Sequence, residues 1–248
     1  MSSCELLFGN PNAHTGLDST RCQPRCSCGG LEFAPPTYGA AFVESLRLDW
    51  VLEAPFPLIE NDPYAGPAPT PKGDDAVCAL RAGAAPKAGP RPYTLIDFTS
   101  ESEARVAGAV VTHFGGCGVC SSLVNLAVYM REPDLTAPVR ACGLESKDRA
   151  AHVTCLRALG FDEACAQIWY WNTLHTRAKC LGPCLSALSE PYQDETGNLN
   201  ACLACDEKES GPVFKAIGGR TRRNSGLPNA LCRPCSEVRP LVHAYPVN

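Results

Sequence analysis

Apolar residues in the middle of the chain recur every three or four positions, which is the spacing of one face of an α-helix. The clearest stripe covers 119–130 and predicts a buried central helix, and a weaker one predicts a helix over 39–53. Two more helices are expected, from 146 to 160, where a glycine ends the pattern, and from 163 to 180 or beyond. The latter should break at Gly182-Pro183, because proline lacks the amide that continues a helix.

Shorter apolar runs predict β-strands around these helices. Tyr93–Phe98 is expected to be a strand, and Ser100 can cap a helix over about 101–108. Val110–Phe114 is expected to be a strand or the tail of that helix. A further run, 213–217, is the clearest strand expected in an otherwise loop-like stretch from 191 to 248. The pattern as a whole predicts an α+β fold with more helix than strand.

Proline, glycine and alanine mark the one internal boundary that the sequence suggests. They crowd residues 54–92, which should form an extended surface segment. We therefore expect a loop-rich N-terminal arm over 1–92, with one helix, and a helix-rich main part over 93–248 whose C-terminal end is rich in cysteine. Together they are expected to form a single domain stapled by disulfides.

Composition narrows the class of protein further. The 248 residues carry a net charge of −4, and this absence of a basic excess argues against nucleic acid as a partner. No run of apolar residues is long enough to cross a membrane. The first residues lack the basic and apolar stretches of a signal peptide, so none is expected in this chain.

Sixteen cysteines are the most informative feature of the composition. They could pair as disulfides in an oxidising compartment, or the close pairs could hold a metal in a reducing one. Five isolated cysteines favour disulfides, because metal sites draw on clustered ligands: Cys4, Cys78, Cys142, Cys155 and Cys165. We therefore expect a secreted or periplasmic protein without a cofactor.

Zinc is the alternative for the C-terminal cysteines. Two C-x-x-C pairs, Cys202 with Cys205 and Cys232 with Cys235, have the spacing of two zinc knuckles. On this interpretation residues 202–235 would form a four-thiolate zinc module.

The segment around Cys117-Gly118-Val119-Cys120 carries the strongest suggestion of catalysis. A glycine-rich turn should place a thiol in the first turn of a helix, where backbone amides and the helix dipole favour the thiolate. The order of strand, C-x-x-C and helix resembles the thioredoxin-like redox site, which implies Cys117 as the attacking thiol and Cys120 as the resolving one. His113, close in sequence, could tune Cys117.

The same segment also resembles the papain-like cysteine site, in which a C-G-x-C sequence opens a helix. That resemblance implies Cys120 as the nucleophile and His243 as its base. The non-catalytic alternative is that Cys117 and Cys120 bond to different cysteines and anchor the central helix.

Two other groups could bind a ligand. Arg220, Arg222 and Arg223 lie in a glycine-bracketed loop that is expected to be exposed, and their planar donors suit an anionic ligand or a protein partner. The alternative is a solvated turn whose arginines pair with nearby acidic residues. Asn172 and His175 share a helix face beside aromatic residues and could line a pocket.

The sequence thus leads to a first functional hypothesis and two alternatives. The first is an extracytoplasmic disulfide-rich protein with a cysteine-centred site at Cys117 and Cys120, for thiol–disulfide exchange or hydrolysis. The alternatives are a non-catalytic extracellular structural or binding protein, and a zinc-binding module at 202–235.

Overall fold

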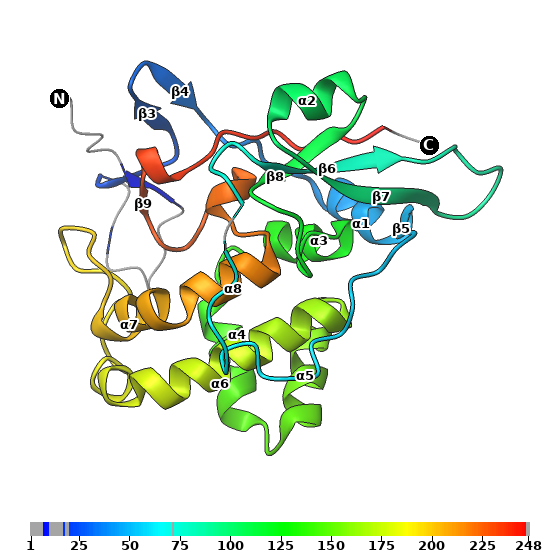
Figure 1. Ribbon diagram of the computed structural model, residues 1–248. Helices are drawn as coiled ribbons and strands as arrows, with labels where there is room; N and C mark the ends of the chain where they lie inside the picture. Colours follow the sequence, from blue (N-terminus) through cyan, green and yellow to red (C-terminus); the bar gives the residue numbers. More distant parts are fainter. Residues whose placement is uncertain (1–6, 10–16, 18–19, 71, 247–248) are drawn as a thin grey trace.

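The computed structural model describes residues 7–9, 17, 20–70 and 72–246. It has the α+β architecture that the sequence predicts, with eight α-helices in the described part of the chain. A small sheet with helices on both faces occupies one end of the molecule, and a group of longer helices occupies the other (Figure 1).

The main sheet has four strands in the order β5-β7-β6-β8. β5 (Trp50–Leu52) runs parallel to β7 (Arg91–Phe98), whereas β6 (Val77–Ala82) is antiparallel to both β7 and β8 (Val110–Phe114). The sequence predicted β7 and β8 but placed β6 within the extended segment. The first four residues of β6 are all buried, so this inner strand lacks the polar alternation that would have revealed it.

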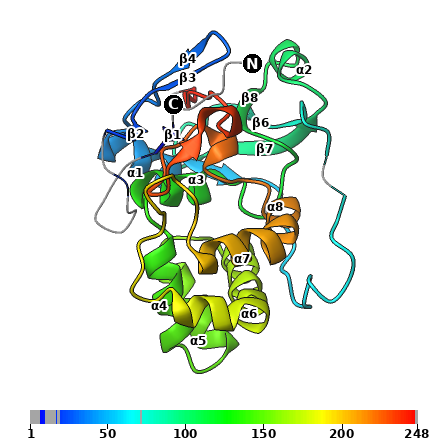
Figure 2. The same ribbon diagram turned by 90° about the vertical axis from the view of Figure 1, so that its left-hand side faces the viewer.

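Three helices cover the sheet on its two sides (Figures 1 and 2). α2 (Glu101–Val106) lies on one side and is capped as expected, since the Ser100 side chain accepts a hydrogen bond from the Glu103 amide. α1 (Ala40–Leu48) and α3 (Leu123–Arg131) pack together on the other side. Ser122 caps α3, so this helix begins later than the apolar stripe over 119–130 predicted.

The helical end is built from α4 (Thr136–Glu145), α5 (Arg149–Ala158), α6 (Glu163–Ser186), α7 (Ala201–Glu209) and α8 (Gly211–Gly218). The sequence located α6 well, because Asp162 caps it by accepting from the Cys165 amide.

Three expectations for this end are wrong. α6 does not break at Gly182-Pro183 but carries Pro183 inside its last turn. The cap of α5 is Asp148, not Ser146, because the Asp148 carboxylate accepts from the Ala151 amide. Residues 213–217 are helical, in α8: their apolar side chains form a helix face packed against α6 and α7 rather than a strand.

Short strands hold the N-terminal arm against the C-terminal part. β1 (Leu7–Phe8) pairs with β2 (Cys22–Gln23) and with β9 (Arg233–Pro234), and β3 (Cys26–Cys28) pairs with β4 (Leu31–Phe33). Two short 3-10 turns, η1 (Arg223–Ser225) and η2 (Cys235–Glu237), complete the described elements.

Disulfides link segments at both ends of the molecule, and no described cysteine is free. The pairs between described residues are Cys22–Cys232, Cys26–Cys235, Cys78–Cys117, Cys120–Cys165, Cys142–Cys155, Cys180–Cys205 and Cys184–Cys202. Cys28 is disulfide-bonded as well. Cys4 lies outside the described residues. The predicted disulfide-rich fold is confirmed, and such a density of disulfides is typical of an oxidising extracellular or periplasmic compartment.

The proline-rich segment runs across the outside of α5 and α6 before the chain returns to β6 (Figure 1). The Ile59 carbonyl accepts from the Trp171 indole at 3.0 Å and from the Arg149 guanidinium at 2.7 Å. Tyr64 donates its hydroxyl proton to the Asn172 side chain at 2.9 Å. The segment is therefore extended, as expected, and is fixed to the helices by side chains that bond to it. Across the described residues, no helix has both the length and the hydropathy needed to span a bilayer.

Candidate functional site

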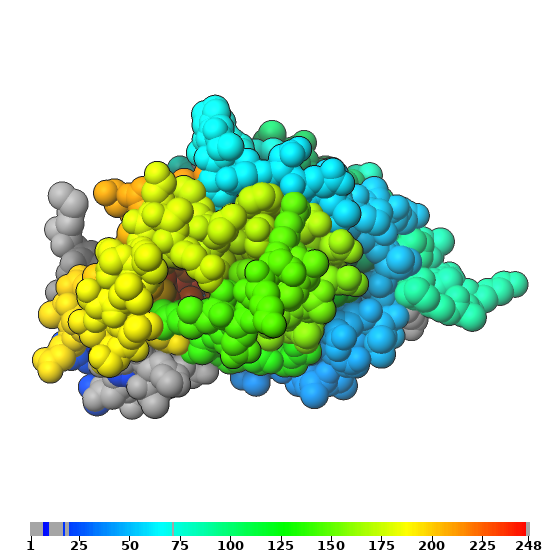
Figure 3. Space-filling view, turned by 90° about the horizontal axis from the view of Figure 1, so that it is seen from below, coloured from blue at the N-terminus to red at the C-terminus, as the bar shows by residue number. Residues whose placement is uncertain are grey.

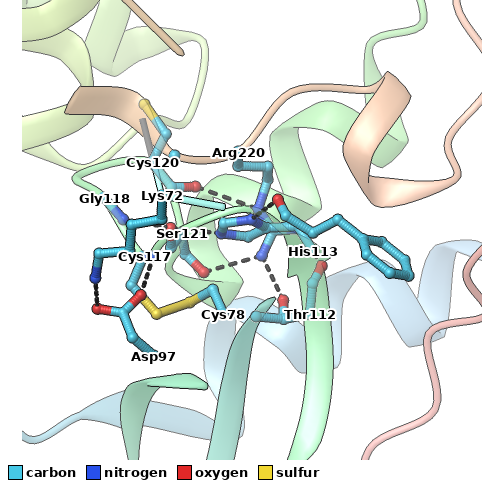
Figure 4. Close-up of a disulfide and its surroundings, with 12 residues drawn as sticks. Lys72, Cys78, Asp97, Thr112, His113, Cys117, Gly118, Cys120, Ser121 and Arg220 are labelled. Atoms are coloured by element: carbon cyan, nitrogen blue, oxygen red, sulfur yellow. Dashed lines mark hydrogen bonds and ion pairs between the residues drawn. A yellow bond between two sulfur atoms is a disulfide. The ribbon is translucent and has the colours of Figure 1, made fainter. Parts of the chain in front are cut away.

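Cys117 and Cys120 lie between β8 and α3, but they do not form a pair. Cys117 is bonded to Cys78 on β6 and Cys120 to Cys165 on α6, so the non-catalytic alternative describes their bonding (Figure 4). The expectation of a thiol in the first turn of a helix is wrong, because α3 begins at Leu123. Cys120 and Cys165 are both fully buried.

The two histidines expected to assist the cysteines are engaged with other groups. His113 Nδ1 lies 2.9 Å from the Phe114 carbonyl, which can only accept, so Nδ1 carries the proton and Nε2 accepts from the Ser121 hydroxyl at 2.7 Å. His243 Nε2 lies 2.9 Å from the Ser225 carbonyl, and its Nδ1 is 3.0 Å from Tyr245 Oη. Burial lowers the pKa of His243 to about 3 and that of His113 well below its usual value, so both rings are neutral.

Arg220 is the centre that joins these elements. It has no exposed surface, which makes the expectation of an exposed loop wrong for this residue. Its five N–H donors meet five acceptors, all of them uncharged: the Cys120, Thr112 and Ser121 carbonyls and the Thr112 and Ser225 hydroxyls. We call Arg220 and these four residues the Arg220 hub.

Every donor of the hub arginine is thus already used. Burial lowers the pKa of Arg220 to about 10, so the guanidinium still carries its charge at neutral pH. Because no N–H remains to bind an anion, Arg220 serves to tie β8 to the loop before α3.

Gly219 allows Arg220 to enter this position. Its φ of +75° is accessible to glycine, and a Cβ there would stand 2.6 Å from the Gly118 amide nitrogen and 2.8 Å from the Gly116 carbonyl oxygen. The end of α8 also bonds directly to the cysteine loop, since the Val119 and Cys120 amides donate to the Ile217 and Gly218 carbonyls, each at 2.9 Å. The loops at 117–120 and 218–220 therefore form one tightly packed unit.

The cysteines of the zinc alternative are spread over four disulfides. Cys202 and Cys205, on α7, bond to α6, whereas Cys232 and Cys235 bond to the N-terminal arm. Each sulfur is covalently bonded to another sulfur and so lacks the thiolate that zinc binds. Among the described residues, no cluster of three or more His, Cys, Asp or Glu side chains has the arrangement of a metal site.

Asn172 and His175 take part in a polar network between α6 and α7. Asn172 donates to Asp206 at 3.2 Å, and His175 stacks on Tyr64 and lies 3.0 Å from the Ser210 hydroxyl. Burial raises the pKa of Asp206. Asn172 is among the residues that line a pocket, whereas His175 is not.

That pocket is a cavity within the helical end. It has a volume of about 360 Å³ and lies between α4, α6, α7, α8 and the chain around residues 221–233. Its opening faces away from the sheet, between the green α4 and the yellow end of α6, with orange-red C-terminal residues visible inside (Figure 3). A volume of this size lies within the usual range of small-molecule sites, about 300–1,000 Å³.

The pocket walls are mostly apolar, and the opening is too. Trp169, Phe214 and Val139 contribute to the inner walls. Four leucines of the lining are 53–70% exposed: Leu144, Leu181, Leu185 and Leu188. An apolar cavity that opens through exposed leucines is typical of a site for an apolar ligand.

The pocket is also rich in arginine. Its charged lining comprises Arg140, Arg177, Arg222, Arg223, Arg233, Asp206 and Glu207. Glu207 is shared by Arg233 and Arg223, and Arg223 also pairs with Glu237. Five arginines against two acids leave an excess of positive charge here, although the chain as a whole is acidic.

Arg222 differs from Arg220 in how many of its donors are used. Its described hydrogen bonds go to the Tyr129, Pro228 and Glu132 carbonyls, which occupy three of its five N–H groups. Its guanidinium also lies 5.4 Å from the centre of the Tyr129 ring. Burial lowers the pKa of Arg222 to about 10, so this pocket residue remains charged at neutral pH. The expectation of an exposed loop is wrong here too.

Three buried donors of the pocket residues have no hydrogen-bond acceptor among the described residues: Tyr129 Oη, Trp169 Nε1 and Arg233 Nε. Burial raises the pKa of Tyr129 to about 12, and the nearby Trp169 indole acts weakly in the opposite direction as a hydrogen-bond donor, although the two groups do not form a hydrogen bond of normal geometry. Buried polar atoms are normally bonded, so this concentration of unused donors around one cavity is unusual.

The sequence did not predict this pocket, although it contains the regular spacing of the leucines that border the opening. Leu181, Leu185 and Leu188 have the spacing of one helix face and continue past the expected break at Pro183. Cys180 and Cys184 lie on the neighbouring face, which is bonded to α7. The leucine face is therefore not covered by any described residue and borders the opening.

Comparison with known protein families gives one match. Residues 149–240 match the model of a family of unknown function (DUF8771), and this region contains α5 to α8 and the arginines from Arg220 to Arg233. The match covers well under half of the chain. No curated protein and no solved structure matches it.

Proposed function

We propose that the protein is a non-catalytic binding protein of an oxidising extracellular or periplasmic compartment, and that it holds a small apolar ligand in the pocket between α4, α6, α7 and α8. One observation carries the proposal: an apolar cavity of about 360 Å³ that opens between exposed leucines. Disulfides in α4, α6 and α7 tie three of the cavity walls to neighbouring elements.

The cysteine-centred hypothesis receives less support. Thiol chemistry at Cys117 or Cys120 would first require reduction of its disulfide, and the Cys120–Cys165 pair is fully buried. His113 and His243 bond to oxygen atoms of the hub and its surroundings rather than to sulfur. The described geometry therefore favours binding over catalysis.

Titration with a neutral apolar dye, N-phenyl-1-naphthylamine, tests the proposal. We expect saturable fluorescence with one dye per chain. Leu185→Asp places a charge at the opening and should weaken binding roughly three- to tenfold, because contact with an apolar side chain is lost. Absence of saturable binding would contradict the proposal.

The matched control is Leu174→Asp. Leu174 is also an exposed leucine of α6, but it does not line the pocket. This variant should bind the dye like the wild type. Equal weakening in both variants would mean that the dye adheres to exposed leucines in general.

A further inference from the structure

The arginines inside the pocket indicate what kind of apolar ligand fits. We infer that the ligand is an amphiphile with one hydrocarbon chain and an anionic head such as a carboxylate, bound with the head innermost. The inference rests on the proposed function, since it assigns the chemistry of the same pocket.

The exposed fraction of the side chains differs between the two ends of the pocket. Arg222 and Arg233 are 7% and 8% exposed, whereas the leucines of the opening are more than half exposed. Arg222 and Arg233 thus lie at the inner end, beside buried apolar residues such as Phe214, whereas the outer end is bordered by the leucines and by the exposed Arg177. A ligand whose anionic head meets the two buried arginines and whose hydrocarbon chain meets the leucines matches this order.

Unused donors supply the second argument. Arg222 has two N–H groups without a described acceptor. Guanidinium N–H groups only donate, so a ligand atom that meets them must accept. An anionic oxygen accepts several such bonds at once and makes them stronger than a neutral oxygen does.

Charge gives the third argument. Arg140 on α4 lines the pocket and forms no hydrogen bond or ion pair with any described residue. Glu207 is occupied by Arg233 and Arg223, and Asp206 is bonded to Asn172 and Thr176. The pocket therefore repels a cationic head and attracts an anionic one.

Competition against the neutral dye tests this with three ligands of equal chain length: dodecanoate, dodecanol and dodecyltrimethylammonium, each below its micelle concentration. We expect dodecanoate to displace the dye at a concentration roughly tenfold or more below that of dodecanol, as hydrogen bonds to a charged group imply. The ammonium compound should be the weakest competitor. Equal potency of acid and alcohol, or a preference for the cation, would overturn the inference while dye binding still upheld the proposed function.

Variants of the pocket arginines test where the anionic head of the ligand binds. Arg222→Gln should retain dye binding but lose most of the preference for dodecanoate. Since Arg222 also holds three carbonyls, Arg223→Gln provides a second variant, which should reduce the preference roughly threefold or more by removing a nearby charge. The control is Arg105→Gln, an exposed arginine of α2 far from the pocket, which should leave the preference unchanged. A full preference in both pocket variants would overturn the head-innermost orientation.

Discussion

Arg220 and Arg222 are separated by a single residue but differ in how many of their N–H donors are hydrogen-bonded within the protein. Arg220 uses all five of its donors on oxygen atoms of the hub, whereas Arg222 uses three and borders a cavity. Both are buried, both are charged, and neither has a carboxylate among its hydrogen-bond partners. The difference teaches that burial does not separate a structural arginine from a binding one; the number of donors left unused does.

The hub and the pocket are also connected. The Cys120–Cys165 disulfide joins the hub loop to α6, and α6 forms one wall of the pocket. Measuring both the free energy of unfolding and the dye affinity of each variant therefore tests whether the two regions depend on one another.

Replacing Arg220 by Met should have the largest effect. Five acceptors would lose their donor inside the protein, so we expect the free energy of unfolding to fall by about 3–5 kcal/mol. Denaturant unfolding with the disulfides intact measures this. The same change at Arg223, whose ion pairs are partly exposed, should cost less than about 1 kcal/mol. Similar losses in the two variants would show that the hub has no special role.

Removing the Cys120–Cys165 disulfide by a double alanine variant should have the next largest effect. Loss of this link is expected to cost about 2–4 kcal/mol, mainly by freeing the unfolded chain. The shorter loop closed by Cys142–Cys155 should cost about 1 kcal/mol less when opened in the same way. Dye affinity measured well below the unfolding temperature should be retained, and its loss would show that the link also shapes the pocket.

Acid should weaken the hub through His243. The folded pKa of about 3 lies below the usual value of 6.5, so the unfolded chain binds a proton that the folded chain does not. Stability is therefore full above about pH 6.5 and falls as the pH decreases, by roughly 2 kcal/mol between pH 7 and pH 5.

His243→Gln provides the comparison for this effect. Unfolding curves of the variant should show a shallower dependence on pH over the same range. An unchanged dependence would assign the acid sensitivity to other groups.

Replacing a tyrosine by phenylalanine in each region should change the free energy of unfolding least. The two variants compare directly a hydroxyl that is hydrogen-bonded with one that is not. Tyr245→Phe removes a hydroxyl that donates to Thr112 and contacts His243, so we expect a loss of about 1–2 kcal/mol. Tyr129→Phe removes a hydroxyl that forms no hydrogen bond of normal geometry with a described residue, so it should leave stability unchanged or raise it by up to about 1 kcal/mol. A loss of equal size at Tyr129 would mean that its hydroxyl is bonded after all.

Local chemistry made much of the fold predictable. Ser100 and Asp162 were recognisable as helix caps, and β7 and β8 as strands, because each signal lies within a few residues of sequence. β6 was missed since an inner strand is apolar on both faces. Residues 213–217 were predicted to form a strand because so short an apolar run is compatible with the period of a helix and with that of a strand. Packing against α6 and α7 favours the helix.

The candidate site is formed by contacts between segments that lie far apart in the chain, and the sequence alone does not show these contacts. The cysteines predicted oxidation but not connectivity, so Cys117 and Cys120 looked like a pair although they belong to different disulfides. Arg220 and Arg222 looked alike because their difference lies in which carbonyls surround them. The pocket itself joins α4 to residues about ninety positions later in the chain, and no local pattern reveals such a meeting.

The disulfides Cys22–Cys232 and Cys26–Cys235 have a mechanical consequence. Each spans about 210 residues, so together they close the protein into a covalent ring from which the two tails extend. Tension applied to the tails would first pull His243 and Tyr245 away from the hub, since both lie beyond Cys235. It would then pass through these sulfur bridges and the short strands beside them, bypassing the sheet and the pocket. A protease cut in the proline-rich segment would likewise leave one molecule, because both products stay attached through the same bridges.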